Sequence, residues 1–272
     1  MLIDSHCHLD PAYLPEGPGE VLARAEAAGV GAFVCIGVGR DLGAARGAVA
    51  LADERANVFA TVGVHPHDAA TTSDADLDEI ARLARHPRVV AVGEVGLDHH
   101  YQHSPRDVQE RMFRRMIGLA KEVRKPLVIH TRSAPAETLA VLEEERAREV
   151  GGIIHCFSED RAFAERVLAI EFDLSFSGIL TFKNADAIRE AARFAPMDRI
   201  LVETDSPFLA PAPLRGKKCE PAYIVHTARF LAETRGTSPE VVARATTANV
   251  VRRLALASVA PAEHDKREVF FG

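Results

Sequence analysis

The chain has 272 residues, of which 47% are hydrophobic and 26% are charged, so its composition is that of an ordinary globular protein. A formal net charge of −6 argues against a broad basic surface for duplex nucleic acid, although it leaves room for a small local anion site. The opening segment MLIDSHCHLD lacks a basic region and a long apolar run, and the cysteines form no CxxC pair, so we expect a cytoplasmic protein without a membrane contact.

Short apolar runs alternate with amphipathic stretches of helical length along the chain. Strands are predicted at residues 2–4, 32–37, 58–64, 89–94, 127–130, 153–156, 172–176 and 200–203. Helices are predicted at residues 19–28, 42–54, 75–85, 107–123, 136–150, 160–169, 185–194, 223–235 and 239–256. The polar tail from residue 260 onwards has no predicted element.

This alternation predicts an α/β protein, a (β/α)8 TIM barrel, which we expect to form one domain over residues 1–272. The alternative is an open, doubly wound sheet. The barrel is favoured because the first, fourth, fifth, sixth and eighth predicted strands all end beside His, Asp or Glu. In a barrel those ends surround one mouth, whereas in an open sheet strands so far apart in sequence rarely meet.

The residues at these strand ends are of the types that bind metal ions. His6 and His8 lie two residues apart, so on an extended chain both side chains point the same way. His130 and His155 end two later strands, and Glu94 ends the fourth. Because an isolated buried charge is very costly, a bound cation is the simplest partner for this set. We therefore expect a metal centre at the mouth.

Two carboxylates have predicted roles in that centre. Glu94 has two oxygens and can bridge two cations, as a carbamylated lysine does in many barrel hydrolases, and no lysine precedes Lys121. Asp205 is expected to bind a cation and to accept the proton of the attacking water, with Glu203 behind it. Water bound to a metal can reach a pKa near ~7, which gives hydroxide at neutral pH.

Other side chains near the mouth are candidates for contact with substrate. His65, after the third strand, is expected to bind a phosphate oxygen or to donate a proton. The candidate substrate-binding cations are Arg132, Lys183 and Arg215. Arg132 shares a face with His130, and Arg215 opens the basic run 215–218, where a phosphate backbone would need counter-charge.

Three residues are assigned less direct roles. Asp98 is expected to order the loop that follows it, or to hold a ligand imidazole in place. His67 and His99 are expected to face solvent.

Together these motifs resemble the TatD-type metal-dependent deoxyribonucleases, in the branch that keeps the HxH pair. The matching segments are DSHCHLD at 4–10, VGVHPH at 62–67, VGEVGLD at 92–98, PLVIHTR at 126–132, GGIIHCFS at 151–158, FSGILTFKN at 176–184, LVETDSPFLAPAPLRGKK at 201–218 and TTANV at 246–250. The resemblance implies a barrel of the metal-dependent hydrolase superfamily with two divalent cations, for which Mg, Mn and Zn are candidates. It implies one cation on His6, His8, Glu94 and Asp205, and a second on Glu94, His130 and His155.

The resemblance also implies a hydrolase of ester bonds that cleaves the phosphodiesters of DNA, as a 3′-to-5′ exonuclease on ends or single strands. We expect it to act as a monomer. One alternative is a binuclear hydrolase of a small ester, amide or lactone, because one fold hosts many chemistries. Another is a metal-bound scaffold without activity, which would need a broken ligand set, yet every expected ligand is present.

Overall fold

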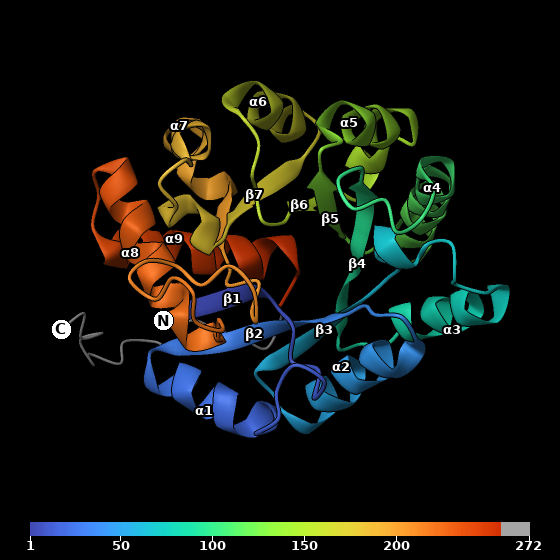
Figure 1. Ribbon diagram of the computed structural model, residues 1–272, viewed down its shortest axis with the longest axis horizontal. Helices are drawn as coiled ribbons and strands as arrows, with labels where there is room; N and C mark the ends of the chain where they lie inside the picture. The colour runs from blue at the N-terminus through green and yellow to red at the C-terminus, as the bar shows by residue number, and fades with distance from the viewer. Residues whose placement is uncertain (257–272) are drawn as a thin grey trace.

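The computed structural model describes residues 1–256 and shows a ring of parallel strands surrounded by helices (Figure 1). The strands are β1 (Leu2–Cys7), β2 (Val30–Gly37), β3 (Val58–Val62), β4 (Val89–Asp98), β5 (Leu127–Arg132), β6 (Gly152–Ile154), β7 (Phe172–Phe176) and β8 (Ile200–Val202). They pair in parallel in chain order, and a parallel bridge between Cys7 and Ser206 joins the end of β1 to the segment after β8. The predicted TIM barrel is confirmed, and the open sheet is excluded.

The helices lie outside the ring and cover the strands (Figure 1). They are α1 (Pro18–Ala27), α2 (Leu42–Glu54), α3 (Asp74–Ala84), α4 (Arg106–Val123), α5 (Pro135–Glu144), α6 (Arg161–Ala169), α7 (Asp186–Phe194), α8 (Ile224–Arg235) and α9 (Pro239–Arg253). Short 3-10 turns lie at η1 (Pro66–Asp68), η2 (Ala147–Glu149), η3 (Gly178–Thr181), η4 (Met197–Arg199) and η5 (Pro221–Tyr223).

Local chemistry fixes several helix ends. Helix α3 begins with a capping box, in which the Ser73 hydroxyl accepts from the backbone N–H of Asp76 and the Asp76 carboxylate accepts from that of Ser73. The predicted helix at residues 136–150 is too long, because α5 ends at Glu144 and Arg146 has a φ of +50°. That left-handed conformation interrupts the helical hydrogen bonds.

The strand boundaries differ from prediction where polar residues take part in the ladder. Strand β4 continues past Glu94, and its pairing with β5 extends to Asp98 opposite Arg132. The uninterrupted apolar run ends at Val92, so it does not reveal the extension of the strand to Asp98. Strands β3, β6 and β8 are shorter than predicted, and their histidine or carboxylate therefore lies on the loop just beyond.

Polar side chains close the seam between the first and last strands. The Asp4 carboxylate is fully buried and accepts hydrogen bonds from the backbone N–H and the hydroxyl of Thr204, at 2.9 and 2.6 Å. The Ser5 hydroxyl donates to the carbonyl oxygen of Val202 at 3.0 Å. These bonds fix the start of β1 beside the segment that carries Asp205.

A second buried carboxylate holds the opposite end of the barrel. Asp173, near the start of β7, is fully buried and receives hydrogen bonds from Arg199, Arg252 and Arg253. Arg252 and Arg253 lie in the last turn of α9, so Asp173 joins this helix to the end of the barrel opposite the mouth.

In the part of the chain that the structure describes, no helix is both long and apolar enough to cross a membrane. The unassigned tail from residue 260 lies outside the described residues. The expectation of one domain over residues 1–272 stays a prediction.

Candidate metal centre

Glu94 lies at the centre of a cluster of histidines at the mouth. Its side chain is only 4% exposed, and its two oxygens face different partners. Oε2 lies 3.4 Å from Nε2 of His6. Oε1 lies 2.8 Å from Nδ1 of His130, 2.9 Å from Nε2 of His155 and 3.5 Å from Nε2 of His65. Strands from opposite sides of the ring thus bring four imidazoles to one carboxylate.

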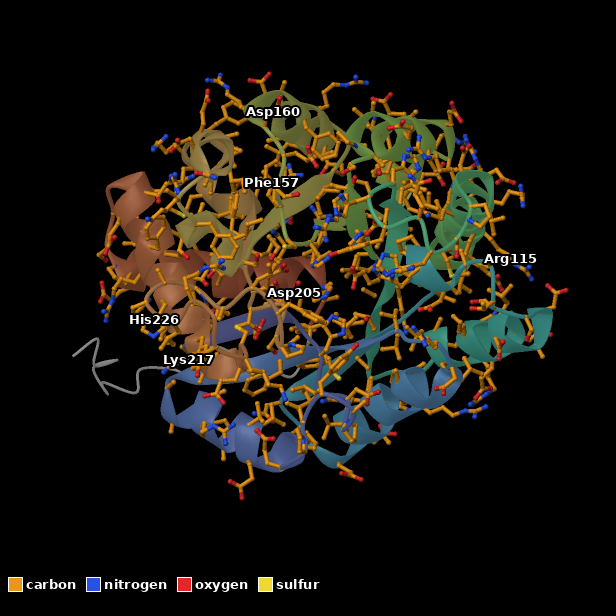
Figure 2. All side chains as sticks on the ribbon, viewed as in Figure 1. Arg115, Phe157, Asp160, Asp205, Lys217 and His226 are labelled. Carbon is orange, nitrogen blue, oxygen red and sulfur yellow. The ribbon has the colours of Figure 1, made fainter. Side chains whose placement is uncertain are left out.

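Asp205 completes the cluster on the side of β1, and lies near the middle of the ring in the view of Figure 2. Its Oδ1 is 3.6 Å from Nε2 of His6 and 3.5 Å from Nε2 of His8. His6 therefore lies between the two carboxylates and is fully buried, while His8 and Asp205 are partly exposed. The structure brings together all six residues expected to bind metal.

The environment of His6 fits a bound cation. Both of its ring nitrogens are buried and neither has a hydrogen-bond partner, although one must carry a proton or a ligand. Its Nε2 lies 3.4 Å from Oε2 of Glu94 and 3.6 Å from Oδ1 of Asp205, which are longer separations than those of ordinary hydrogen bonds. Imidazole nitrogens and carboxylate oxygens together are the ligands of zinc, manganese and related divalent ions.

Three groups of residues could each hold a metal ion, because within each group the possible ligand atoms lie within 4.8 Å of one another. They are His6 with His8 and Asp205, His65 with Glu94 and His130, and His6 with His155 and Glu203. The first falls within one expected ligand set. The second adds His65, which the sequence did not require as a ligand.

The histidines and carboxylates of the cluster shift one another's pKa values. Burial would raise the pKa of Glu94, but His155 and His65 outweigh burial and hold it well below its usual range. Burial would lower the pKa of His155, but the carboxylates of Glu94 and Glu203 hold it well above its usual range. For His65 burial dominates and lowers the pKa to about 4, so this ring is neutral near pH 7.

Two of the imidazoles expected to bind metal contact carboxylates behind them. Glu203 is fully buried, with Oε1 3.2 Å from Nδ1 of His155 and 2.6 Å from the backbone nitrogen of Cys156. An Nδ1–H donated to Glu203 leaves Nε2 of His155 directed at Glu94. Glu203 thus contacts His155, whereas it was expected behind Asp205.

Asp98 makes the contacts that both of its expected roles need. Oδ2 lies 3.2 Å from Nε2 of His130 and 2.9 Å from Nε2 of His67. Oδ1 accepts the backbone N–H groups of His100 and Tyr101 and so orders the loop. His67 was expected to face solvent, and it is 27% exposed, because the loop turns its ring back onto Asp98.

His99 is also not solvated as expected: it is 9% exposed, tucked under the loop after β4. Neither position has a periodic neighbour in sequence that would have revealed its burial.

The three candidate substrate-binding cations lie apart from the cluster. Arg132 is exposed, with its guanidinium 4.6 Å above the Tyr101 ring, and Arg215 lies 3.4 Å above Phe182. Lys183 is exposed. Within residues 1–256 no hydrogen bond or ion pair joins any of them to Glu94 or its histidines, so their part in binding stays a prediction.

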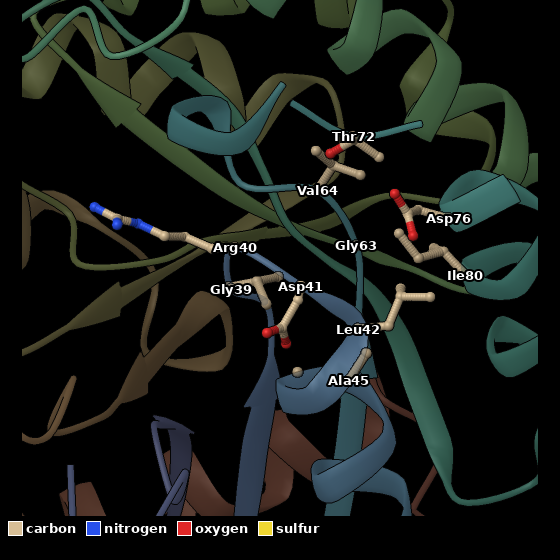
Figure 3. Close-up of a pocket in the computed structure, with 12 residues that line it drawn as sticks. Gly39, Arg40, Asp41, Leu42, Ala45, Gly63, Val64, Thr72, Asp76 and Ile80 are labelled. Carbon is tan, nitrogen blue, oxygen red and sulfur yellow. The ribbon is translucent and has the colours of Figure 1, made fainter. Parts of the chain in front are cut away.

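Arg40 is a cation at the mouth that the sequence reading missed. It follows β2 and lines a small hollow beside Gly37, Gly63 and Asp76, from which its side chain points away (Figure 3). Its charge opposes the rise that burial imposes on the pKa of Asp68, so it lies near the loop after β3. The lining of this hollow includes no member of the cluster around Glu94.

A TIM barrel whose strand ends gather histidines and carboxylates around unsatisfied nitrogen donors defines a class, the metal-dependent hydrolases. Within that class the chain belongs to the TatD family, because the family model described as TatD related DNase matches residues 3–255. The resemblance drawn from the sequence motifs is therefore confirmed.

Relatives and solved structures agree with this assignment. The uncharacterized metal-dependent hydrolase YcfH of Escherichia coli strain K12 is 43% identical over 254 residues, which cover 92% of this chain and 94% of YcfH. The 3'-5' ssDNA/RNA exonuclease TatD of Citrobacter koseri is 33% identical and covers 92% of this chain and 97% of its own. The crystal structure of YJJV, a TatD homolog from Escherichia coli K12, matches with a TM-score of 0.85 and 26% identity, over 93% of this chain and 98% of that one.

Proposed function

We propose that this chain hydrolyses the phosphodiester bonds of DNA with two divalent cations, and that it removes nucleotides from the 3′ ends of single strands. The observation that carries the two-cation part is the position of Glu94. Its Oε2 faces His6 and its Oε1 faces His130 and His155, so one carboxylate stands between two groups of ligand atoms. In this proposal His6, His8, Glu94 and Asp205 hold one cation, and Glu94, His130 and His155 hold the other.

The proposal that the substrate is a phosphodiester is supported by a named relative and by exposed basic residues near the mouth. A relative 33% identical to this chain is named as an exonuclease on single-stranded DNA and RNA, so RNA is a substrate to test beside DNA. Arg132, the last residue of β5, and the basic run 215–218, on the loop after β8, are exposed. A net charge of −6 favours short or single strands, whose binding depends on few local cations.

When bound, the cations would polarise a phosphoryl oxygen as Lewis acids. The protein groups around them have separate tasks. Asp205 accepts the proton of the attacking water. Its side chain is 13% exposed and that of Glu94 only 4%, so water reaches the carboxylate of Asp205 more easily. Glu203 and Asp98 hold the rings of His155 and His130 in the tautomers that leave their other nitrogens free.

His65 is suited to hold the substrate. Its Nδ1 accepts the backbone N–H of His67 at 3.2 Å, so the ring proton belongs on Nε2, which faces the cluster. Because burial keeps the ring neutral near pH 7, His65 offers a hydrogen bond to a phosphate oxygen and not a positive charge.

The test is nuclease activity of metal-stripped protein refilled with Mg²⁺, Mn²⁺ or Zn²⁺, on 5′-labelled single-stranded DNA and RNA. A ladder that shortens from the 3′ end, absent with Glu94→Ala, is the expected result. Metal-loaded protein that cleaves neither polymer would contradict the proposal. Turnover of a small ester, amide or lactone in that case would favour the alternative hydrolase.

A further inference from the structure

Exposed aromatic rings gather at the mouth of the barrel. Among residues 1–256 the large apolar side chains that are exposed include Tyr13, Tyr101 and Phe208, at 41, 51 and 47%. They follow β1, β4 and β8 respectively, so all three lie on the loops at the end of the barrel that carries the metal cluster. Burial of such rings would stabilise the fold, and their exposure at one end suggests a ligand.

Tyr13 and Phe208 form a pair beside the cluster. Their ring centroids are 5.8 Å apart at an interplanar angle of 74°. Each also meets the ring of His8 edge-on, at 6.1 Å and 72° for Tyr13 and at 5.9 Å and 77° for Phe208. Because 41% of Tyr13 and 47% of Phe208 stay exposed, the pair offers open aromatic surface beside His8, whose Nε2 lies 3.5 Å from Oδ1 of Asp205.

The loop that carries Tyr13 is held in place. The ammonium of Lys218 donates to the carbonyl oxygen of Tyr13. Arg24 on α1 pairs with both Glu16, at 3.3 Å, and Glu220, at 2.6 Å. These contacts join the loop after β1 to the basic loop after β8, so Tyr13 is held in position before a ligand binds. Less conformational entropy is then lost on binding.

Tyr101 differs from this pair, because its ring is already engaged. The guanidinium of Arg132 lies 4.6 Å from its centroid, and His103 stacks on it at 5.7 Å with planes 7° apart. In an eight-stranded ring β4 lies across from β8, so Tyr101 stands on the far side of the cluster from Phe208. It provides a matched exposed ring for comparison.

We propose that Tyr13 and Phe208 form a stacking site for one nucleobase of the substrate, next to the phosphodiester at the metal cluster. The inference rests on the proposed function. Stacking on aromatic rings holds bases of any sequence, because every base has a π-face. Two side chains are far smaller than the about 800 Å² that each partner buries in a stable protein interface, so a base fits this surface better than a protein does.

The test compares substrates with and without a base, and proteins with and without the rings. A single abasic tetrahydrofuran nucleotide is placed at each of the last three positions of a 5′-labelled oligothymidylate. For wild-type protein, removal of the base at one position should lower kcat/KM roughly five- to a hundredfold. For the variant with Tyr13→Ala and Phe208→Ala, the same removal should cost nothing, while Tyr13→Phe should behave as wild type.

Tyr101→Ala is the matched control, and it should keep the penalty for the missing base. An equal loss by the double variant on complete and abasic substrates would overturn the inference, because it would indicate a structural role. So would a double variant that cleaves all substrates as wild type does.

A binding measurement separates this inference from the proposed function. A tetranucleotide that contains 2-aminopurine should lose fluorescence when it binds wild-type protein, and should keep it with the double variant. Quenching without cleavage would contradict the nuclease and leave the base site standing. Cleavage without quenching at any of the four positions would contradict the base site alone.

Discussion

The imidazole rings of His6 and His155 are stacked, with centroids 3.9 Å apart and planes 13° from parallel. His6 lies in β1 and His155 comes just after β6, so the stack exists only in the closed ring. Their Nε2 atoms lie 3.4 and 2.9 Å from different oxygens of Glu94. Two nitrogen donors thus stand side by side before the two oxygens of one carboxylate, which fits the proposal of two cations that share Glu94.

Replacement of Glu94 by alanine should therefore remove both cations. The side chain contributes an oxygen to each group of ligand atoms, so its loss weakens both sites at once. Metal content per chain after dialysis against trace metal, measured by elemental mass spectrometry, checks this. Glu137→Ala, a half-exposed acid on α5, is the matched control and should keep its metal. Full occupancy in Glu94→Ala would rule out the shared ligand.

Replacement of Asp205 by asparagine should abolish turnover while leaving the fold intact. Asparagine keeps the shape of the side chain but is not a base, and positioned proton transfer contributes about 10²- to 10⁴-fold to a rate. Single-turnover cleavage rates, together with circular dichroism spectra and melting curves, separate activity from folding. A rate within threefold of wild type would show that another group accepts the proton.

Cation binding should release protons near neutral pH. The pKa of His155 in the metal-free protein lies well above its ordinary value of 6.5, because Glu94 and Glu203 outweigh burial. A cation needs the unprotonated nitrogen, so its affinity should rise with pH. Calorimetric titration in buffers of different ionisation enthalpy should give heats that differ with the buffer, and identical heats would contradict this prediction.

The same raised pKa has a consequence for the stability of the metal-free protein. A protonated His155 stabilises the fold fully below pH 6.5, and this contribution is lost as the pH rises through the folded pKa. Urea midpoints of metal-free protein should therefore fall from pH 6.5 upwards, and less steeply in His155→Gln.

Replacement of Asp173 by asparagine should destabilise the barrel without affecting the cluster. The acid is fully buried among three arginines, and removal of one partner from a buried charge pair costs about 3–5 kcal/mol. Urea unfolding checks the loss, and turnover below the unfolding transition should stay at the wild-type rate. Asp186→Asn is the control, because that acid is 92% exposed and should cost under about 1 kcal/mol.

Loss of a phosphate-binding cation should change the salt dependence of substrate binding. For single strands the slope of log K against log salt is about −0.7 per phosphate neutralised. Arg132→Ala and Arg215→Ala should each make the slope shallower by roughly that amount, whereas Arg111→Ala on the outer face of α4 should not. Unchanged slopes in both would move the substrate path elsewhere.

The sequence was sufficient for the architecture because its information is local. Alternating apolar strands and amphipathic helices are visible within windows of a few residues, and parallel connections allow few topologies. Boundaries were less accurate where polar residues join the ladder, as Asp98 and Arg132 do at the end of the pairing between β4 and β5. The closure of the seam by Asp4 and Thr204 could not be predicted, because these residues are 200 positions apart.

The site divides in the same way. His6, Glu94 and His155 could be grouped in advance because the ends of parallel strands in a barrel meet at one mouth. The positions of His67 and Arg40 could not, because each depends on the path of a loop. Asp173 lies within a predicted strand, but the three arginines that make it structurally important come from other segments, two of them at the end of the last described helix.

The seam between Asp4 and Thr204 has a consequence for the synthesis of the protein. The ligand atoms at His6 and Asp205 belong to the two sides of this seam, so a ribosome must release nearly the whole barrel before they can meet. A growing chain that ends before residue 205 has histidines but no complete cluster. For a protein proposed to cut DNA, shortened products of interrupted synthesis would therefore lack Asp205 and should be inactive as nucleases.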